Sequence, residues 1–427
     1  MVGTLLRQVR LLDPASQTDQ VMDVLMVDEV FQAIAPALPE PSTDVNVIDA
    51  TGQVLAPGLV DLYSHSSEPG NESRETLADL MTGAIAGGVT RLGILPNTVP
   101  PLEHPGAIRY LLDLACELPV TPQPFLLPWA ALTQGTLGQQ MTELAELARL
   151  QQVALAGFCD GCALNNPVLL RRLLEYLRPL NCLVALWPCD QALTGNGIAR
   201  EGSVALMGGL PGSPIAAETV ALATLLELVR EIGTPVHIMR VSTARSVELI
   251  AQAKSQGLPI TASTTWMHLL FSTHDVLSYD PNLRLEPPVG NQIDQIALAH
   301  GVKTGVIDAI AIDHSPYTYE EKTVAFRDAP PGAIGLELAF ATLWQRFIIS
   351  GEWPALTLLK AMSLNPAKCL GITSSNIAVG RRVEAFLFNP ATVWTVEPST
   401  LRSPACNTPF LGQSLSGKVV QVWIELG

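Results

Sequence analysis

From Leu59 onward, short apolar segments alternate with longer segments of helical periodicity over most of the chain. Short apolar runs predict buried strands, and apolar residues recurring every three or four positions predict amphipathic helices. The strand candidates are RLGIL (91–95), PFLLPW (124–129), ALAGF (154–158), CLVALW (182–187), PVHIM (235–239), PITAST (259–264) and IDAIAID (307–313). The helix candidates span 74–88, 169–177, 218–233, 243–257 and 292–301.

This alternation predicts an α/β fold with a parallel sheet, and seven or eight such units predict a (β/α)₈ TIM barrel. An open, doubly wound sheet is the alternative. No glycine-rich phosphate-binding turn follows the first strand, so the barrel is preferred.

Both ends of the chain have a different pattern, with short alternating strands and turns. Residues 1–55 and 371–427 are each of this kind, whereas 56–370 carry the barrel pattern. We therefore expect one small β domain composed of both termini beside the barrel.

Composition excludes several classes of protein. Hydrophobic residues make up 48% and charged residues 15%, which excludes a disordered chain. A formal net charge of −15 argues against nucleic-acid binding. No apolar run is long enough for a membrane span, and no secretory signal precedes the first strand. The seven cysteines are scattered and do not suggest a disulfide framework, so we expect a cytoplasmic protein.

Polar residues cluster directly after several predicted strands, where barrel active sites lie. The segment PGLVDLYSHSSEPG (57–70) resembles the opening signature of cyclic-amide hydrolases, in which Asp-x-His-x-His precedes an Arg and then Pro-Gly. Asp61 and His65 match this signature. Tyr63 stands at the position of the first metal-binding His, and Ser67 stands at the position of the substrate-binding Arg.

Further segments resemble the dihydroorotase family of the amidohydrolase superfamily, in the same order along the chain. The segment 83–102 ends a strand in Pro-Asn-Thr, IDAIAIDHSP (307–316) resembles the last barrel strand, and 326–337 resembles the loop that meets the substrate ring. The resemblance implies substrate contacts at Asn97, Ala329 and Gly332. It also implies that Asp313 is the catalytic base as well as a metal ligand. Tyr317 replaces a substrate-contacting His.

The family holds two zinc ions, and this chain keeps only part of the ligand set that the resemblance implies. His65, Asp160 and Asp313 remain as a residual metal set that we expect to be unoccupied.

Three histidine ligands of the family are replaced, by Tyr63, Trp187 and Arg240. A guanidinium cannot ligate zinc and would repel it. We predict that Arg240 points into the barrel mouth and pairs with Asp160, Asp313 or both, while Trp187 fills the volume of the metals. His237, three residues upstream of Arg240, is out of register with the site.

One further cluster invites a different interpretation. Cys159-x-x-Cys162, with Cys189 one strand later, could form a replacement metal site or a redox pair. Buried structural thiols are the simpler explanation of such a pattern.

We therefore predict a dihydroorotase-like protein of de novo pyrimidine biosynthesis that is catalytically impaired, binds no cofactor and acts as a structural partner of aspartate carbamoyltransferase. Self-association and binding of a small cyclic amide are further possibilities for its interactions. The alternative is an active dihydroorotase or related cyclic-amide hydrolase that works with a reduced zinc site. Without a metal, such an enzyme would lose both a Lewis acid and a low-pKa water.

Overall fold

The structure is a computed structural model, and it describes residues 3–41, 45–152 and 155–424. Residue 154 of the predicted strand 154–158 lies outside these ranges. So do residues 1–2, 42–44 and 425–427 of the predicted small β domain.

Eight parallel strands form the barrel, and they follow each other in chain order around the sheet. They are β6 (Leu59–Ser64), β7 (Val89–Ile94), β8 (Phe125–Ala130), β9 (Gly157–Phe158), β10 (Val184–Leu186), β13 (Val236–Ile238), β14 (Ile260–Thr265) and β15 (Ala309–Ala311). Backbone hydrogen bonds join the last strand to the first: His65 N donates to His314 O over 2.8 Å, and Asp313 N donates to Tyr63 O over 3.2 Å. The predicted (β/α)₈ barrel is confirmed, and an open sheet is excluded by this closure.

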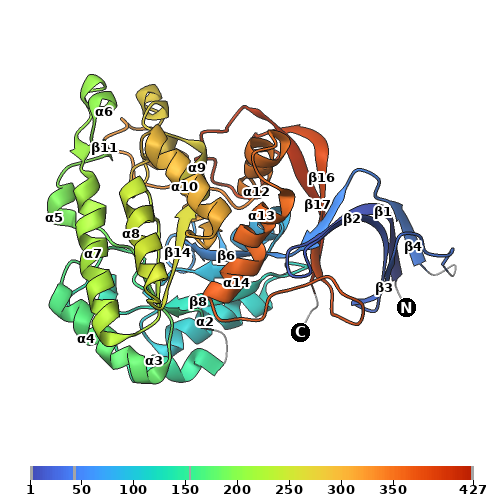
Figure 1. Cartoon of the computed structure of the whole chain (residues 1–427), viewed down its shortest axis with the longest axis horizontal. Coiled ribbons are helices and arrows are strands. Elements are labelled where there is room, and N and C mark those ends of the chain that lie inside the picture. Colours follow the sequence, from blue (N-terminus) through green and yellow to red (C-terminus); the bar gives the residue numbers. More distant parts are fainter. Residues whose placement is uncertain (1–2, 42–44, 153–154, 425–427) are drawn as a thin grey trace.

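Helices cover the outside of the barrel (Figure 1). The described helices are α1 (Leu77–Ala86), α2 (Pro105–Glu117), α3 (Leu144–Ala148), α4 (Pro167–Leu177), α5 (Gln191–Thr194), α6 (Ser203–Met207), α7 (Ile215–Ile232), α8 (Ala244–Ser255), α9 (Trp266–Leu270), α10 (Gln292–Thr304), α11 (Tyr319–Lys322), α12 (Ala339–Leu343), α13 (Ala355–Leu359) and α14 (Asn365–Cys369). Capping boxes begin α1 at Thr76 and α10 at Asn291, where the side chains satisfy otherwise unpaired backbone N–H groups. None of the helices in the described part of the chain is long and apolar enough to cross a membrane.

The second sheet takes strands from both ends of the chain and lies at one side of the barrel (Figure 1). Its strands are β1 (Gly3–Asp13), β2 (Thr18–Val27), β3 (Val30–Ala35), β4 (Val45–Asp49), β5 (Val54–Pro57), β16 (Glu384–Thr395) and β17 (Ser414–Ile424). Strand β5 joins the two ends, because it pairs with β1 on one edge and with β16 on the other. A two-stranded sheet, β11 (Ala199–Arg200) with β12 (Gly212–Ser213), was not predicted.

The interior of the barrel is packed with large side chains. Tyr63 and Trp129 are fully buried there, and Trp129 Nε1 donates to the Leu62 carbonyl over 2.9 Å. Trp187 and Met239 belong to the same cluster. The barrel is therefore filled up to its mouth, as parallel barrels require.

Candidate functional site

An arginine–aspartate pair lies at the mouth of the barrel, just beyond the carboxyl ends of two strands. Arg240 follows β13 and Asp313 follows β15. Arg240 Nε donates to Asp313 Oδ2 over 2.7 Å, and Nη2 donates to Oδ1 over 2.7 Å. This bidentate ion pair is the strongest kind of contact between a guanidinium and a carboxylate. It confirms the predicted position of Arg240 in the barrel mouth and its pairing with Asp313.

Both members of the pair have left-handed backbone conformations. The φ angle is +54° at Arg240 and +54° at Asp313. Residues other than glycine adopt this backbone region at a cost of about 1–2 kcal/mol, and residues strained in this way are often found at functional sites. The two side chains meet at the barrel mouth from these backbone conformations.

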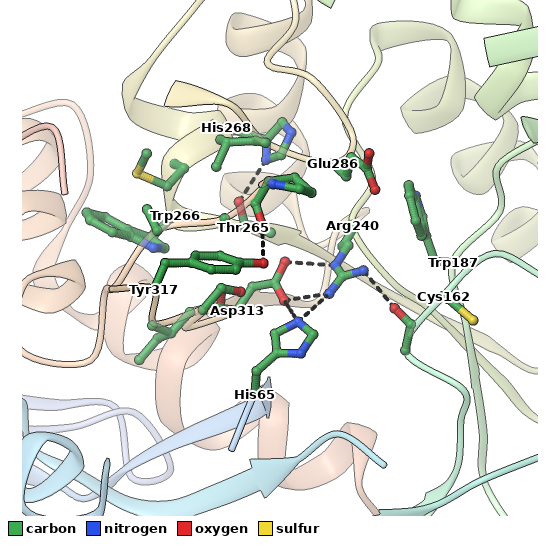
Figure 2. A pocket seen from close by; sticks show the side chains of 18 residues that line it. His65, Cys162, Trp187, Arg240, Thr265, Trp266, His268, Glu286, Asp313 and Tyr317 are labelled. Carbon is green, nitrogen blue, oxygen red and sulfur yellow. Dashed lines mark hydrogen bonds and ion pairs between the residues drawn. The ribbon is translucent and has the colours of Figure 1, made fainter. Parts of the chain in front are cut away.

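The remaining contacts of Arg240 fix its guanidinium on all sides (Figure 2). Nη1 donates to the Gly161 carbonyl over 2.9 Å, and Nη2 lies 3.4 Å from His65 Nε2. The guanidinium carbon lies 5.3 Å from the ring centre of Trp187, within the range of a cation–π contact. Burial alone would lower the pKa of Arg240, but the charge of Asp313 and its hydrogen bonds to Arg240, with smaller contributions from Tyr63 and Cys159, together raise it. Arg240 is therefore a fixed cation.

Tyr63 lies below Arg240 and supports it from inside the barrel. Its hydroxyl accepts from the Arg240 backbone N–H over 3.2 Å and lies 2.9 Å from Ser263 Oγ. Burial raises the pKa of Tyr63, so the phenol stays protonated. His237 reaches the same Ser263 hydroxyl, 2.9 Å from its Nε2, and so lies below the mouth instead of within it.

His65 remains at the mouth but is held in its neutral form. Burial lowers the pKa of His65 to about 4, and the nearby Arg240 charge adds to this effect, although Asp313 opposes it. The Asn97 side chain lies 2.9–3.1 Å from His65 Nδ1. Because Nδ1 interacts with Asn97, Nε2 is the nitrogen that faces Arg240 and Asp313.

Asp160 is directed away from this group. Its Oδ1 accepts from the backbone N–H groups of Leu132 and Thr133 over 2.8 and 2.9 Å, and its Oδ2 accepts from the Thr133 hydroxyl over 2.6 Å. Burial raises the pKa of Asp160, although these hydrogen bonds oppose the shift. Asp160 thus stabilises the loop after β8, and Arg240 pairs with Asp313 alone.

The residues present do not fit a zinc ion. Zinc needs lone pairs directed at one point, but Arg240 occupies both oxygens of Asp313 and lies against the free nitrogen of His65. Asp160 has its acceptors satisfied elsewhere. No three His, Cys, Asp or Glu side chains in the described ranges form a group that could hold a metal ion.

The cysteine cluster does not form a redox pair or a metal site among the described residues. Cys159 Sγ lies 3.5 Å from Met239 Sδ, whereas Cys162 Sγ contacts the Thr136 carbonyl over 3.1 Å. Burial raises the pKa of Cys162 to about 11 and also raises that of Cys159. Both are therefore protonated thiols, which are poor nucleophiles and poor ligands.

A cavity of about 160 Å³ opens above the Arg240–Asp313 pair. We call it the first cavity. Of the residues expected to contact a substrate, Gly332 lines it, as does Tyr317, whose hydroxyl donates to the Pro331 carbonyl over 3.0 Å. Ala329 is buried outside the lining, and Asn97 reaches the cavity only through its contact with His65.

Sequence reasoning missed several residues that line the first cavity, namely Trp266, His268 and Glu286. His268 Nδ1 lies 2.7 Å from the Thr265 hydroxyl, and its Nε2 lies 3.0 Å from the Pro287 carbonyl. Glu286 precedes two prolines, and this pattern does not mark it as a cavity residue.

The cavity leaves room for a small molecule above the pair, and the two side chains that the resemblance marks as catalytic or metal-binding, Asp313 and His65, are both held in contacts with Arg240. As a general base, Asp313 would first have to lose two charge-assisted hydrogen bonds to Arg240. His65 is neutral, but its Nε2 faces a fixed cation.

Comparison with known proteins agrees with this architecture. Residues 52–246 match the Dihydro-orotase-like family model, and residues 201–425 match the Amidohydrolase family model. A "Probable dihydroorotase-like protein" of Synechocystis sp. is 43% identical, covering 97% of this chain and 98% of its own. A dihydroorotase of Syntrophus aciditrophicus is 34% identical, covering 99% of this chain and 97% of its own.

Among solved structures, the L-hydantoinase (dihydropyrimidinase) of Arthrobacter aurescens superposes with a TM-score of 0.85 at 22% identity, covering 99% of this chain and 95% of its own. At this identity the likeness concerns the fold. The match of both family models and the full-length identity to the sequence relatives show that this chain belongs to the dihydroorotase-like family of the amidohydrolase superfamily.

Proposed function

We propose that this chain is a catalytically impaired dihydroorotase homologue that acts as a structural partner of aspartate carbamoyltransferase in pyrimidine biosynthesis. The observation that carries the proposal is the Arg240–Asp313 pair. In this pair, Arg240 donates hydrogen bonds to both oxygens of Asp313, the carboxylate that the family uses as base and metal ligand. Arg240 also places a permanent positive charge beside that carboxylate.

The way in which the site is filled supports a maintained fold. An isolated carboxylate at Asp313, whose side chain is 15% exposed, would be costly to bury without a partner. Arg240 neutralises it, Trp187 stacks against Arg240, and Tyr63 supports the Arg240 backbone. Random decay would leave unpaired charges or gaps, because most substitutions destabilise a protein.

An exposed apolar tip supports an interaction role. Leu206 and Met207 on α6 are 82% and 72% exposed, which is unusual for adjacent large apolar side chains. Helix α6 comes between β10 and α7 in the chain and projects beyond α7 at the upper left of the molecule (Figure 1). Its exposed apolar side chains can therefore pack against a partner protein, and we assign α6 to the interface with aspartate carbamoyltransferase.

Co-elution with aspartate carbamoyltransferase of the same organism tests this proposal. At micromolar concentration the two chains should elute together in size-exclusion chromatography, and Leu206→Glu should separate them. Val393→Glu, which changes a 67% exposed residue of β16 in the other sheet, is the matched control and should leave the complex intact. Separate elution of the unaltered proteins across a range of salt concentrations would refute the partnership.

A second function is supported by the first cavity itself, which stays open above the filled metal site. Its lining includes both charges of the Arg240–Asp313 pair and the further carboxylate of Glu286. This lining favours a neutral cyclic amide over the carboxylate-bearing dihydroorotate. Calorimetric titration with dihydrouracil and with dihydroorotate would test it: tighter binding of dihydroorotate contradicts the assignment.

A further inference from the structure

Strand β17 forms one edge of the seven-stranded sheet, because β16 is the only strand that pairs with it in the described part of the chain. Along an edge strand, backbone N–H and C=O groups point away from the sheet at every second residue and can pair with another chain. Strand β17 is 11 residues long and lies against α12 of the barrel (Figure 1). This edge is therefore long enough to pair with an added strand.

A cavity of about 440 Å³ runs along this edge, and we call it the edge cavity. Its lining includes five consecutive residues of β17, from Lys418 to Val422. Side chains on one face of a strand recur at every second position, so a lining of consecutive residues follows the edge of the strand. Ile85 on α1 and Phe340 on α12 give the cavity an apolar wall. The edge cavity shares no lining residue with the first cavity, so the two are separate sites.

Two cationic side chains line the edge cavity without an acidic partner. Neither Arg402 nor Lys418 forms an ion pair within the described ranges, and the Lys418 ammonium lies 4.8 Å from the ring centre of Trp394. Glu337 also lines the cavity, but its Oε1 accepts from the backbone N–H groups of Arg402 and Ser403 over 2.8 and 3.2 Å. Burial raises the pKa of Glu337, which weakens its negative charge further. In a chain with a net charge of −15, this groove is locally positive and favours an acidic ligand.

The shape of β17 argues against a second copy of the same edge as the ligand. Leu387 pairs with Gln421 and Phe388 pairs with Val419, so Val420 is an unpaired bulge residue. Bulges and lysines on an edge strand hinder its pairing with an identical edge. An acidic partner instead gains attraction from the same lysine.

A small anion would use the two cations but would leave the backbone groups of the edge unpaired. An extended peptide uses both features, because its backbone pairs with the edge while alternate side chains reach the groove. We propose that the β17 edge binds an acidic peptide segment in extended conformation, which adds to the sheet as a further strand and places its carboxylates beside Arg402 and Lys418.

A fluorescein-labelled hexapeptide of alternating glutamate and valine is the probe that tests this site. Fluorescence anisotropy with the full chain should give a dissociation constant on the order of 100 μM. A hexapeptide with lysine in place of glutamate should bind at least about tenfold more weakly, because its charge is reversed. A hexapeptide with proline in place of valine keeps the charge but lacks half of the N–H donors, and it should also bind at least about tenfold more weakly.

Two double variants locate the binding on the protein. Arg402→Gln with Lys418→Gln should weaken binding of the acidic hexapeptide about tenfold, since it removes both cations of the groove. Arg245→Gln with Lys368→Gln changes the net charge by the same amount at two exposed residues outside the edge cavity. This matched control should leave the affinity unchanged.

Hydrogen exchange measured by mass spectrometry separates strand addition from simple charge attraction. A bound strand takes up N–H groups of β17, so their exchange should slow by up to about tenfold at a peptide concentration about ten times the dissociation constant. Exchange in α8, on the outside of the barrel, should not change.

The proposal is overturned if the acidic hexapeptide does not bind, if the lysine hexapeptide binds as tightly, or if binding leaves exchange in β17 unchanged. It is also overturned if the isolated chain forms a dimer that protects β17, because the edge would then belong to a second copy. Should Arg402→Gln with Lys418→Gln fail to fold, the comparison of the three peptides and the exchange measurement still decide. None of these readouts depends on aspartate carbamoyltransferase or on hydrolysis of an amide.

Discussion

Replacing Arg240 by methionine should destabilise the protein strongly, because it leaves the Asp313 carboxylate without its partner. Methionine keeps an unbranched apolar chain between Tyr63 and Trp187, so the packing changes little. What disappears is the pair of hydrogen bonds from Arg240 Nε and Nη2, each 2.7 Å long, together with the positive charge.

Removing one partner of a buried ion pair typically costs about 3–5 kcal/mol. The side chains of Arg240 and Asp313 are 6% and 15% exposed, so the pair is buried but the carboxylate touches the cavity. We therefore expect a loss near the lower limit, about 3 kcal/mol of unfolding free energy. Asp313→Asn should cost a similar amount, since it leaves Arg240 as an unmatched cation.

The double variant distinguishes this argument from a simple loss of packing. Arg240→Met with Asp313→Asn contains no unpaired charge, so its cost should be far below the sum of the two single losses. We expect a coupling energy of about 2 kcal/mol or more. Arg245→Met is the matched control, because the Arg245–Glu248 pair on α8 is 58% and 65% exposed and should contribute less than about 0.5 kcal/mol.

Equilibrium urea unfolding, followed by tryptophan fluorescence and circular dichroism, measures these free energies. Coincidence of the two signals shows that a two-state analysis applies. If Arg240→Met lowered the unfolding free energy no more than Arg245→Met does, the Arg240–Asp313 pair would not stabilise the barrel mouth. The same conclusion would follow if the losses of Arg240→Met and Asp313→Asn simply added in the double variant.

Three further outcomes follow from the same structure. The triple variant Tyr63→His, Trp187→His and Arg240→His should bind zinc in a metal-content assay. It should still hydrolyse dihydroorotate poorly, because Ser67 and Tyr317 stand where the family has substrate-contacting residues; full turnover would contradict this. Burial lowers the pKa of Lys322 to about 7, below its usual 10.5, so the unfolded chain binds more protons between these values. Relative to Lys322→Met, the unaltered protein should therefore gain stability as pH rises from 7 to 10.5, by at most about 1.4 kcal/mol per pH unit, and an opposite slope in urea unfolding would refute the assignment. Leu206→Glu should leave the melting temperature of the isolated chain within about 2 °C, since the residue is exposed, and a large loss would show that the apolar tip packs within the chain.

The barrel could be predicted from sequence because each strand is a short apolar run, and the residues that directly follow the strands lie at one end of the barrel. Arg240 was therefore placed correctly by its position directly after PVHIM, and Asp313 by its position at the end of IDAIAID. Their left-handed backbone conformations could not be read from the sequence, because neither residue is a glycine.

The sequence could not decide whether Arg240 pairs with Asp160 or with Asp313. The answer depends on contacts between residues that lie far apart in the sequence. Asp160 is satisfied by Leu132 and Thr133, which are 28 and 27 residues away in the sequence. Only the packing of the loop after β8 against the loop after β9 decides this.

The turnover of dihydroorotate by the purified chain in the presence of added zinc tests the central claim most directly. The claim is that the Arg240–Asp313 pair has replaced the metal-assisted chemistry of the family. We predict a rate indistinguishable from that of the buffer with zinc alone. Ring opening at about 1 s⁻¹ or faster, which is within the ordinary range of enzymes, would contradict it.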